Sequence, residues 1–311
     1  MPLAWHRAFY SILAGGTAHR NRVHSLGMKL LLPAGIVAAM AWSAAAQAGR
    51  IGTVDFCGYT GLDLQHLRDL MPLKVGGEVP PQPLRESIAH AFAAAIGRDP
   101  VTLDLVCCLQ DGRPSLYNGM PEPGAPPVTF HPSPKGKAKL PPQIVQLDRE
   151  MDTELDNAIG HNLAGEDDSK GYSLSEGPPL RALQLKLREY SRTHAAELLD
   201  VLHACASHDQ RALAAEALGY ADESKRQIAG LAYASFDSNR EVPNNAIRAL
   251  GVLARARSQD NHQVPIDPYI PLLFSTDWTD RNKTLMLLYS FTASRDDRML
   301  QRLRARIGAA S

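Results

Sequence analysis

The chain has 311 residues, and its 33 basic side chains balance its 33 acidic ones. The length allows about two domains, and a hydrophobic fraction of 44% is ordinary for a globular protein. Zero net formal charge argues against the strongly basic surface of a nucleic-acid-binding protein, so no nucleic-acid partner is expected. Few aromatic residues beside many Ala, Leu and Arg favour packed helices over a β-sandwich.

Residues 28–48 have the layout of a secretory signal peptide. Met28 and Lys29 give a short basic start, an apolar run follows, and an A-x-A cleavage site ends at Ala48. The run is shorter than the about 20 apolar residues that a membrane span needs. We predict cleavage after Ala48, a periplasmic or secreted protein, and no stable membrane span in the mature chain. Residues 1–27 are then an upstream extension, with translation starting at Met28.

Residues 49–120 predict a small domain of strands and helices. "RIGTVDFCGY" favours a strand, "LDLQHLRDLM" a short helix and "PLRESIAHAFAAAIGR" a longer helix. The apolar face expected of the longer helix consists of Leu84, Ile88, Ala91, Phe92 and Ala95. "DPVTLDLV" and "RPSLYNGMPE" favour two further strands around a turn at Asp111-Gly112. The predicted order is β-α-α-β-β.

This order, together with the glycines of "VDFCGYTGLDLQHLRDLMPLKVGG", resembles a POTRA module. Such modules are protein-docking domains of the bacterial cell envelope. The Leu67-Arg68 pair and the Gly76-Gly77 doublet carry the likeness, which covers about 70 residues. The resemblance implies a docking role for residues 49–120.

Residues 121–142 are dense in Pro, Gly and Lys and have no apolar period, so they predict a linker, with a long surface loop as the alternative. Residues 143–311 read as helices with short polar breaks, among them the acidic loop "GEDDSKGYSLSEGPP". The predicted fold class is therefore α+β: a small β-α-α-β-β domain followed by an all-α domain.

Three stretches of the all-α region align without gaps and predict a helical repeat. They are "RALAAEALG" from Arg211, "PNNAIRALG" from Pro243 and "RNKTLMLLY" from Arg281, at offsets of 32 and 38. Two columns of the alignment, four residues apart, share a helix face: Ala214, Ala246 and Thr284 in one, and Leu218, Leu250 and Leu288 in the other. An apolar helix precedes each stretch, so each unit is a helix pair that buries its apolar face by stacking on its neighbours.

The unit "HDQRALAAEALGYA" resembles a HEAT repeat, whose second helix tends to open with Asp and Arg and to end in Ala-Leu-Gly. Here those residues are Asp209, Arg211 and the Ala217–Gly219 run. The resemblance covers roughly residues 193–311 and implies an α-solenoid that binds proteins; a smaller group of HEAT-like proteins are bilin lyases. The final "RMLQRLRARIGAAS" looks like the first helix of another pair, either as a cap or as part of a longer array.

The stretch "STDWTDRNKT", residues 275–284, places a Trp among paired charges. Thr276, Asp277 or Thr279 can cap the helix that follows, which accounts for most of these polar residues. Trp278, the only Trp of the predicted mature chain, is not required by a helix start and suits a binding hot spot. The predicted partner-binding residues are Trp278, Arg281, Asn282, Lys283, Arg211, Asn244 and Arg248.

The sequence contains no G-x-S-x-G elbow, H-E-x-x-H or P-loop. Its cysteines have no metal-site spacing, and the Glu166–Asp168 run lacks the spacing of a Ca²⁺ loop. We therefore expect no enzyme, cofactor or metal, and favour an exported, non-enzymatic protein-binding or scaffold protein. Two alternatives stay open: an enzyme or lyase-like accessory protein with a concave-face site around Cys205, His203 and His208, and a structural assembly subunit.

Overall fold

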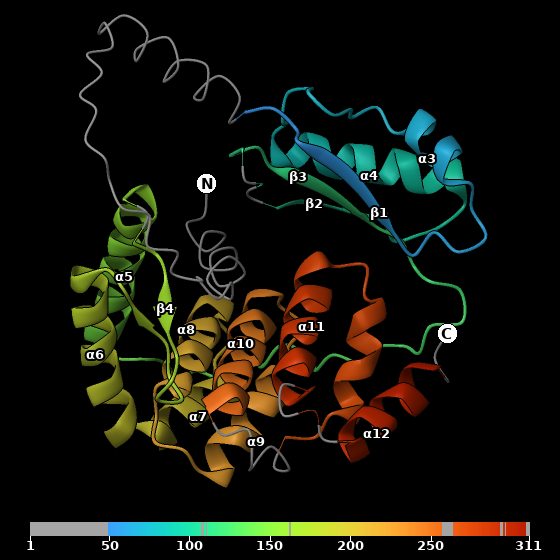
Figure 1. Ribbon diagram of the computed structural model, residues 1–311. Coiled ribbons are helices and arrows are strands. Elements are labelled where there is room, and N and C mark those ends of the chain that lie inside the picture. Colours follow the sequence, from blue (N-terminus) through green and yellow to red (C-terminus); the bar gives the residue numbers. More distant parts are fainter. Residues whose placement is uncertain are drawn as a thin grey trace, which may run out of the picture. The chain divides into compact units, whose positions relative to one another are not determined.

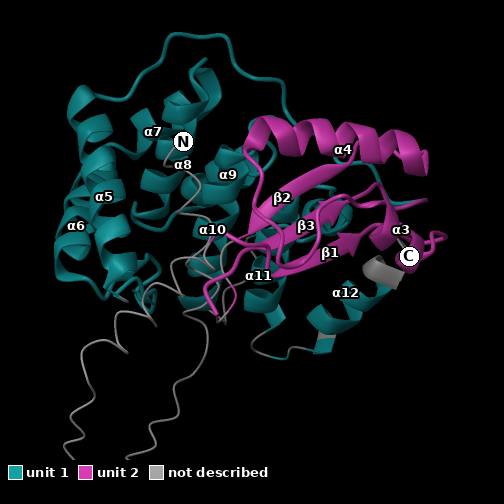
Figure 2. Ribbon diagram, turned by 90° about the horizontal axis from the view of Figure 1, so that it is seen from above, with its two compact units in different colours: residues 1–14, 124–311 teal, residues 15–123 magenta. Residues whose placement is uncertain are grey.

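The computed structural model describes residues 49–106, 109, 111–161, 163–256, 264–292, 295 and 297–308 (Figure 1). The chain divides into two compact units between Pro123 and Gly124 (Figure 2). We call the described residues up to Pro123 the first unit (magenta, labelled unit 2 in Figure 2) and those from Gly124 on the second unit (teal, labelled unit 1). The predicted upstream extension and signal peptide lie outside the described residues. The described part is α+β, with a small mixed sheet in the first unit and mostly helices in the second.

The first unit has the predicted order of elements. In chain order they are β1 (Thr53–Cys57), α3 (Leu64–Leu70), α4 (Gln82–Ile96), β2 (Thr102–Val106) and β3 (Ser115–Gly119). Strand β3 lies in the middle of the sheet, parallel to β1 and antiparallel to β2. This pattern follows from the connections, because the helical crossover from β1 permits a parallel pair and the short turn from β2 an antiparallel one.

Gly58, directly after β1, occupies a position where only glycine fits. Its φ is +73°, and a Cβ built there would lie 1.9 Å from the carbonyl oxygen of Met120. A side chain at this position would therefore collide with backbone at the end of the sheet. The core beneath the sheet contains Leu67, Met71 and Phe92.

The predicted apolar face of α4 is wrong in part. Leu84, Ala91 and Ala95 are exposed, and the helix instead buries Arg85, Ala89, Phe92 and Ala93. Alanines occur all round this helix, so its apolar period is weak, and the burial of Phe92 decides its rotation.

The second unit contains the remaining helices and a short hairpin. Its elements are α5 (Pro142–Gly160), β4 (Glu166–Asp167), β5 (Leu174–Ser175), α6 (Pro178–Thr193), α7 (Ala195–Ala204), α8 (His208–Gly219), α9 (Lys225–Ala234), α10 (Glu241–Ala256), the 3₁₀ helix η3 (Asp267–Phe274), α11 (Trp278–Thr292) and α12 (Asp297–Gly308). Helix α10 packs between α8 and α11, and α7, α9 and η3 pack respectively against α8, α10 and α11.

The three aligned stretches thus lie on three neighbouring helices. Their two alignment columns are buried, as the helical period predicts: Ala214, Ala246, Thr284, Leu218, Leu250 and Leu288. Small residues bring these helices close together, since a Cβ added to Gly219 would lie 2.8 Å from the Cβ of Ala249.

The segment predicted as a linker lies along the helical unit. His131 and Lys137 form isolated β-bridges with Asp237 and Cys205, and the ring of His131 stacks on Tyr233 with centroids 4.3 Å apart. The backbone N–H of Leu140 donates to Oε1 of Gln210 at 2.8 Å. Residues 131–140 therefore follow the surface of this unit instead of acting as a free spacer.

In the described part of the chain, no helix is both long enough and apolar enough to cross a membrane.

Candidate functional site

Arg211, a predicted partner-binding residue, is completely buried in α8. Its guanidinium binds the carboxylate of Asp237 through two contacts, Nε to Oδ2 at 2.7 Å and Nη2 to Oδ1 at 2.9 Å. A third nitrogen, Nη1, donates to the carbonyl oxygens of Cys205 and Ala206. From α8, Arg211 joins the α7–α8 loop to the α9–α10 loop inside the protein. This burial corrects its assignment to a partner surface.

Lys283 and Asn244 are also inside the protein, with exposed fractions of 1% and 7%. Burial, followed by the nearby charge of Arg248, lowers the pKa of Lys283 to about 7, while Glu166 acts in the opposite direction. Neither residue presents a surface to a partner, so the structure removes both from the predicted site.

Arg248 lies on α10 and faces the hairpin formed by β4 and β5. It pairs with Glu166 of β4. Two turns further along α10, the Nε of Arg255 donates to Oδ2 of Asp168 at 2.8 Å. Glu166 and Asp168 are two residues apart in an extended segment, so both point towards α10. The stretch expected to be an acidic loop thus forms a short hairpin whose Glu166 and Asp168 pair with arginines of α10.

A pocket opens beside this hairpin, between α5, α6, α8 and α10. Its lining residues include Met151, Gln184, Glu216, Tyr220 and Arg248. The cavity volume is about 40 Å³, room for only a few water molecules. The pocket is therefore a small gap under the hairpin.

The start of α11 explains most of the polar stretch "STDWTDRNKT". Asp277 precedes the helix, and its Oδ1 accepts the backbone N–H of Thr279 at 2.7 Å. The hydroxyl of Ser275 donates to Oδ2 of Asp280, which is buried in the first turn. The predicted capping of α11 is confirmed, and of the three candidates Thr276, Asp277 and Thr279 it is Asp277 that accepts from the first turn.

The other side of α11 carries the predicted residues that do reach the surface. Trp278, Arg281 and Asn282 are half-buried, and two large side chains further along the same side are exposed, Leu285 by 58% and Tyr289 by 73%. Their positions differ by three or four residues, which places them on one helix face. We call Trp278, Arg281, Asn282, Leu285 and Tyr289 the α11 stripe.

Two donors of the α11 stripe lack acceptors. Nη1 of Arg281 and Nδ2 of Asn282 are buried atoms without a hydrogen-bond partner. Burial lowers the pKa of Arg281 below its ordinary value, and no carboxylate among the described residues offsets that effect. The sequence analysis did not include Leu285 and Tyr289 in the predicted site, because it chose residues from the HEAT-like alignment. Their spacing of seven and eleven residues from Trp278 nevertheless indicates a shared helix face.

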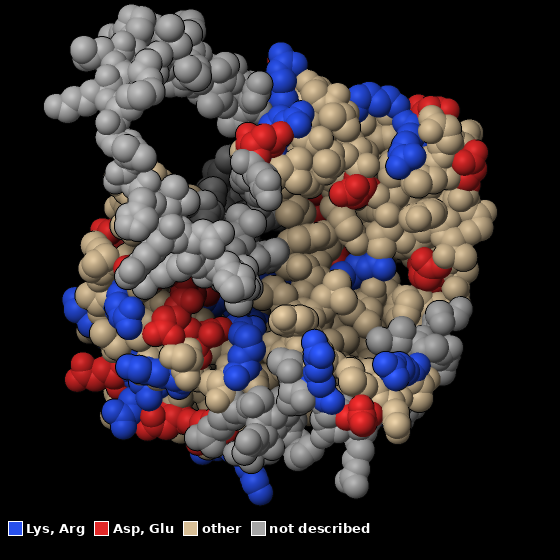
Figure 3. Space-filling model, in the orientation of Figure 1, with Lys and Arg blue, Asp and Glu red and all other residues tan. Residues whose placement is uncertain are grey.

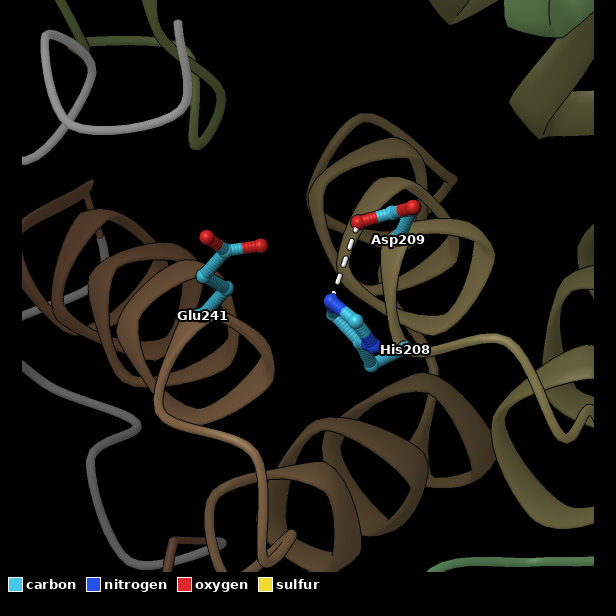
Figure 4. Close-up of side chains that lie close together, drawn as sticks. All are labelled: His208, Asp209 and Glu241. Atoms are coloured by element: carbon cyan, nitrogen blue, oxygen red, sulfur yellow. Dashed lines mark ion pairs between the residues drawn. The ribbon is translucent and has the colours of Figure 1, made fainter. Parts of the chain in front are cut away.

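A second group of side chains meets where α8 and α10 begin. His208 and Asp209 of α8 and Glu241 of α10 point into the same space between the two helix starts (Figure 4). Nε2 of His208 lies 3.2 Å from Oδ1 of Asp209. Sequence reasoning missed this group because Glu241 is more than thirty positions away from the other two.

The residues suggested for a concave-face enzyme do not come together. Cys205 is a buried free thiol in the hydrophobic core, as expected of a small apolar side chain. The ring of His203 lies against Tyr233 with centroids 4.3 Å apart, and its Nδ1 contacts the carbonyl oxygen of Leu199. His208 belongs to the separate group at the helix starts.

Charge does not single out one region on the face shown in Figure 3. On the face shown in Figure 3, the basic and acidic side chains of the described residues lie among one another. Comparison with known proteins adds no relative: no family model, no curated protein and no solved structure matches the chain.

Proposed function

We propose that this chain is an exported, non-enzymatic protein-binding or scaffold protein whose helical unit is a HEAT-like solenoid. The partner site is the α11 stripe, and the occupant is a segment of another protein that offers a carboxylate beside an apolar side chain. The observation that carries this proposal is the exposure of Leu285 and Tyr289 next to Trp278 and Arg281.

The composition of the α11 stripe supports a protein partner. Trp, Tyr and Arg are the residues that most often dominate binding energy at interfaces. Exposed leucines are common singly, but here Leu285 continues a line of aromatic and basic side chains on one helix face. Such a line offers an apolar centre with polar groups at one end, which is the usual anatomy of an interface.

The polar end of the α11 stripe supports the acidic character of the occupant. A buried donor without an acceptor costs about 1–3 kcal/mol. Arg281 and Asn282 each have such an atom, and Arg281 has no carboxylate partner in the described residues. A partner that supplies carboxylate or carbonyl oxygens offsets this cost, and Arg binds carboxylates in a paired geometry.

The arrangement of the helix pairs and the first unit fit the same role. Stacked helix pairs such as α9–α10 and η3–α11 hold a surface rigid without an enclosed cavity, which suits docking of an extended protein surface. The POTRA-like order β1-α3-α4-β2-β3 favours a second docking element in the chain. The signal-like N-terminal sequence supports action outside the cytoplasm.

Site-specific photo-cross-linking tests this function. A photoreactive aromatic residue placed at position 289 is expected to give discrete adducts with one protein in living cells, because Tyr289 is the most exposed part of the α11 stripe. The same residue at position 185 is the matched control, since Leu185 of α6 is also exposed, by 46%. Arg281→Ala in the cross-linking chain is expected to reduce the adduct by roughly tenfold, about the value of one charge-assisted contact.

Two results would count against the proposal. Equal adduct patterns from positions 289 and 185 would mean that the α11 stripe has no preferred partner. An adduct of twice the mass of the chain would identify a second copy as the occupant and support the assembly-subunit alternative.

A further inference from the structure

Three metal-ligating side chains converge at the starts of α8 and α10, outside the α11 stripe. One ring nitrogen of His208 and one carboxylate oxygen each of Asp209 and Glu241 all lie within 4.8 Å of one another. We propose that these residues form a binding site for a divalent transition metal ion of the Zn²⁺ type, with further coordination positions open to water or to a donor from a partner.

The packing of α8 against α10 brings these three side chains close together. Asp209 and Glu241 are 32 positions apart, which is the offset between the aligned stretches at Arg211 and Pro243. The packing of α8 against α10 therefore brings two equivalent positions of successive units side by side. The next equivalent position is Thr279, so the pair of carboxylates occurs at this junction and not at the one between α10 and α11.

The donor set selects the metal class. Zn²⁺ binds imidazole nitrogen and carboxylate oxygen at about 2.0–2.2 Å, which gives a separation of about 3.3 Å between two ligand atoms of a tetrahedron. The distance of 3.2 Å between Nε2 of His208 and Oδ1 of Asp209 matches that edge. Ca²⁺ and Mg²⁺ prefer six or more oxygen ligands, so a site with an imidazole and two carboxylates favours Zn²⁺ over both.

The carboxylate of Glu241 is the third ligand of the proposed site. In the described part of the chain its carboxylate accepts no hydrogen bond, and the neighbouring Arg240 is paired with Asp277 at 3.1 Å. A dication held between Asp209 and Glu241 is attracted to both carboxylates.

Metal binding at this position would cross-link two helix pairs. His208 and Asp209 belong to α8 and Glu241 to α10, so the ion contacts both only while the two helices are packed together. A ligand that binds the folded form alone raises the free energy of unfolding in proportion to its saturation. The site therefore couples metal concentration to the rigidity of the helical unit.

Titration of the full chain with Co²⁺, a spectroscopic substitute for Zn²⁺, tests the proposal. The wild-type protein is expected to develop visible absorption bands of four- or five-coordinate Co²⁺ with one-to-one stoichiometry, and Zn²⁺ is expected to displace the bands. His208→Ala and Glu241→Gln are each expected to weaken binding by at least roughly tenfold, the effect of losing one ligand. His90→Ala is the matched control, because His90 is an exposed histidine on α4, and it is expected to bind as the wild type does.

The readouts separate this site from other sources of metal binding. Zn²⁺ is expected to raise the melting temperature of the wild type and of His90→Ala but not of Glu241→Gln, whose metal-free melting temperature is unchanged. Absence of the Co²⁺ bands, equal binding by His208→Ala, or displacement by Ca²⁺ as readily as by Zn²⁺ would each overturn the proposal. An intense sulfur-to-cobalt charge-transfer band would assign the ion to the cysteines and would overturn it as well.

Discussion

Replacing Arg211 by alanine is expected to destabilise the helical unit more than any other single change at the predicted site. The substitution removes both contacts to Asp237 and the donors to the carbonyl oxygens of Cys205 and Ala206. It also leaves the carboxylate of Asp237 buried without its cation. Breaking a buried ion pair on one side costs about 3–5 kcal/mol, which corresponds to a fall in melting temperature of roughly 6–20 °C.

Chemical denaturation followed by circular dichroism measures this loss. Arg192→Ala is the matched control, because Arg192 also contacts a carboxylate in two places, on Asp222, but both side chains are more than half exposed. An exposed pair contributes about 0–1 kcal/mol, so the control is expected to change stability little. The double variant Arg211→Met/Asp237→Leu is expected to recover much of the loss, since no charge is left unpaired. Equal effects of Arg211→Ala and Arg192→Ala would contradict a structural role for the buried pair.

Replacing Lys283 by methionine is expected to have the opposite effect and to stabilise the protein at pH 6. The side chain is buried in α11, and burial, followed by the charge of Arg248, lowers its pKa from 10.5 to about 7. That difference corresponds to an upper limit of about 5 kcal/mol against the protonated lysine in the folded protein. Methionine keeps the length of the chain and removes the charge, for which a gain of about 1–4 kcal/mol is expected.

The increase in the free energy of unfolding caused by Lys283→Met is expected to disappear as the pH rises. Below pH 7 the folded and unfolded states both hold the proton, so the wild type bears the full cost of the buried charge. Between about pH 7 and 10.5 the unfolded state binds more protons than the folded state, and the free energy of unfolding of the wild type therefore increases with pH. Above both values the lysine is neutral in either state and the cost is gone.

Denaturant titrations of wild type and variant at pH 6, 8 and 9.5 test this dependence. The difference between the two proteins is expected to shrink steadily over this series. Lys186→Met, at an exposed lysine of α6, is the control and is expected to show no such trend. A stability difference for Lys283→Met that is the same at all three pH values would mean that Lys283 is not held neutral in the folded protein.

Local sequence patterns predicted the helices and strands correctly where the apolar period and the turn residues were compatible with a single arrangement. The order β1-α3-α4-β2-β3, the turn at Asp111-Gly112 and the buried columns of α8, α10 and α11 followed from periodicity and glycine placement. The rotation of α4 did not, because alanines make several of its faces equally apolar. The capping of α11 by Asp277 was predictable, since it depends only on residues within one turn.

The candidate site was predictable only in part, because the sequence gives the position of a charged residue along a helix but not its partner. Arg211 and Arg281 occupy the same column of the alignment, yet Asp237 lies in reach of one and no described carboxylate in reach of the other. The pairing of Arg248 with Glu166 depends on a hairpin more than eighty positions away in the chain. None of these partners follows from local spacing.

The sequence by itself determined most of the helices, the strands β1, β2 and β3, and the buried columns of the three aligned helices. These properties depend on periods of two to four residues and on the backbone preferences of Gly, Pro and Asp. The sequence did not predict the hairpin of β4 and β5, which lies in a stretch expected to be a polar loop. Only the tertiary structure decided which side chains of the candidate site are exposed to a partner and which are buried. It buried Arg211, Asn244 and Lys283, left Leu285 and Tyr289 exposed, and brought Glu241 to His208 and Asp209. The physical reason is that burial and charge pairing depend on how helices pack in space, and packing joins residues that no local pattern connects.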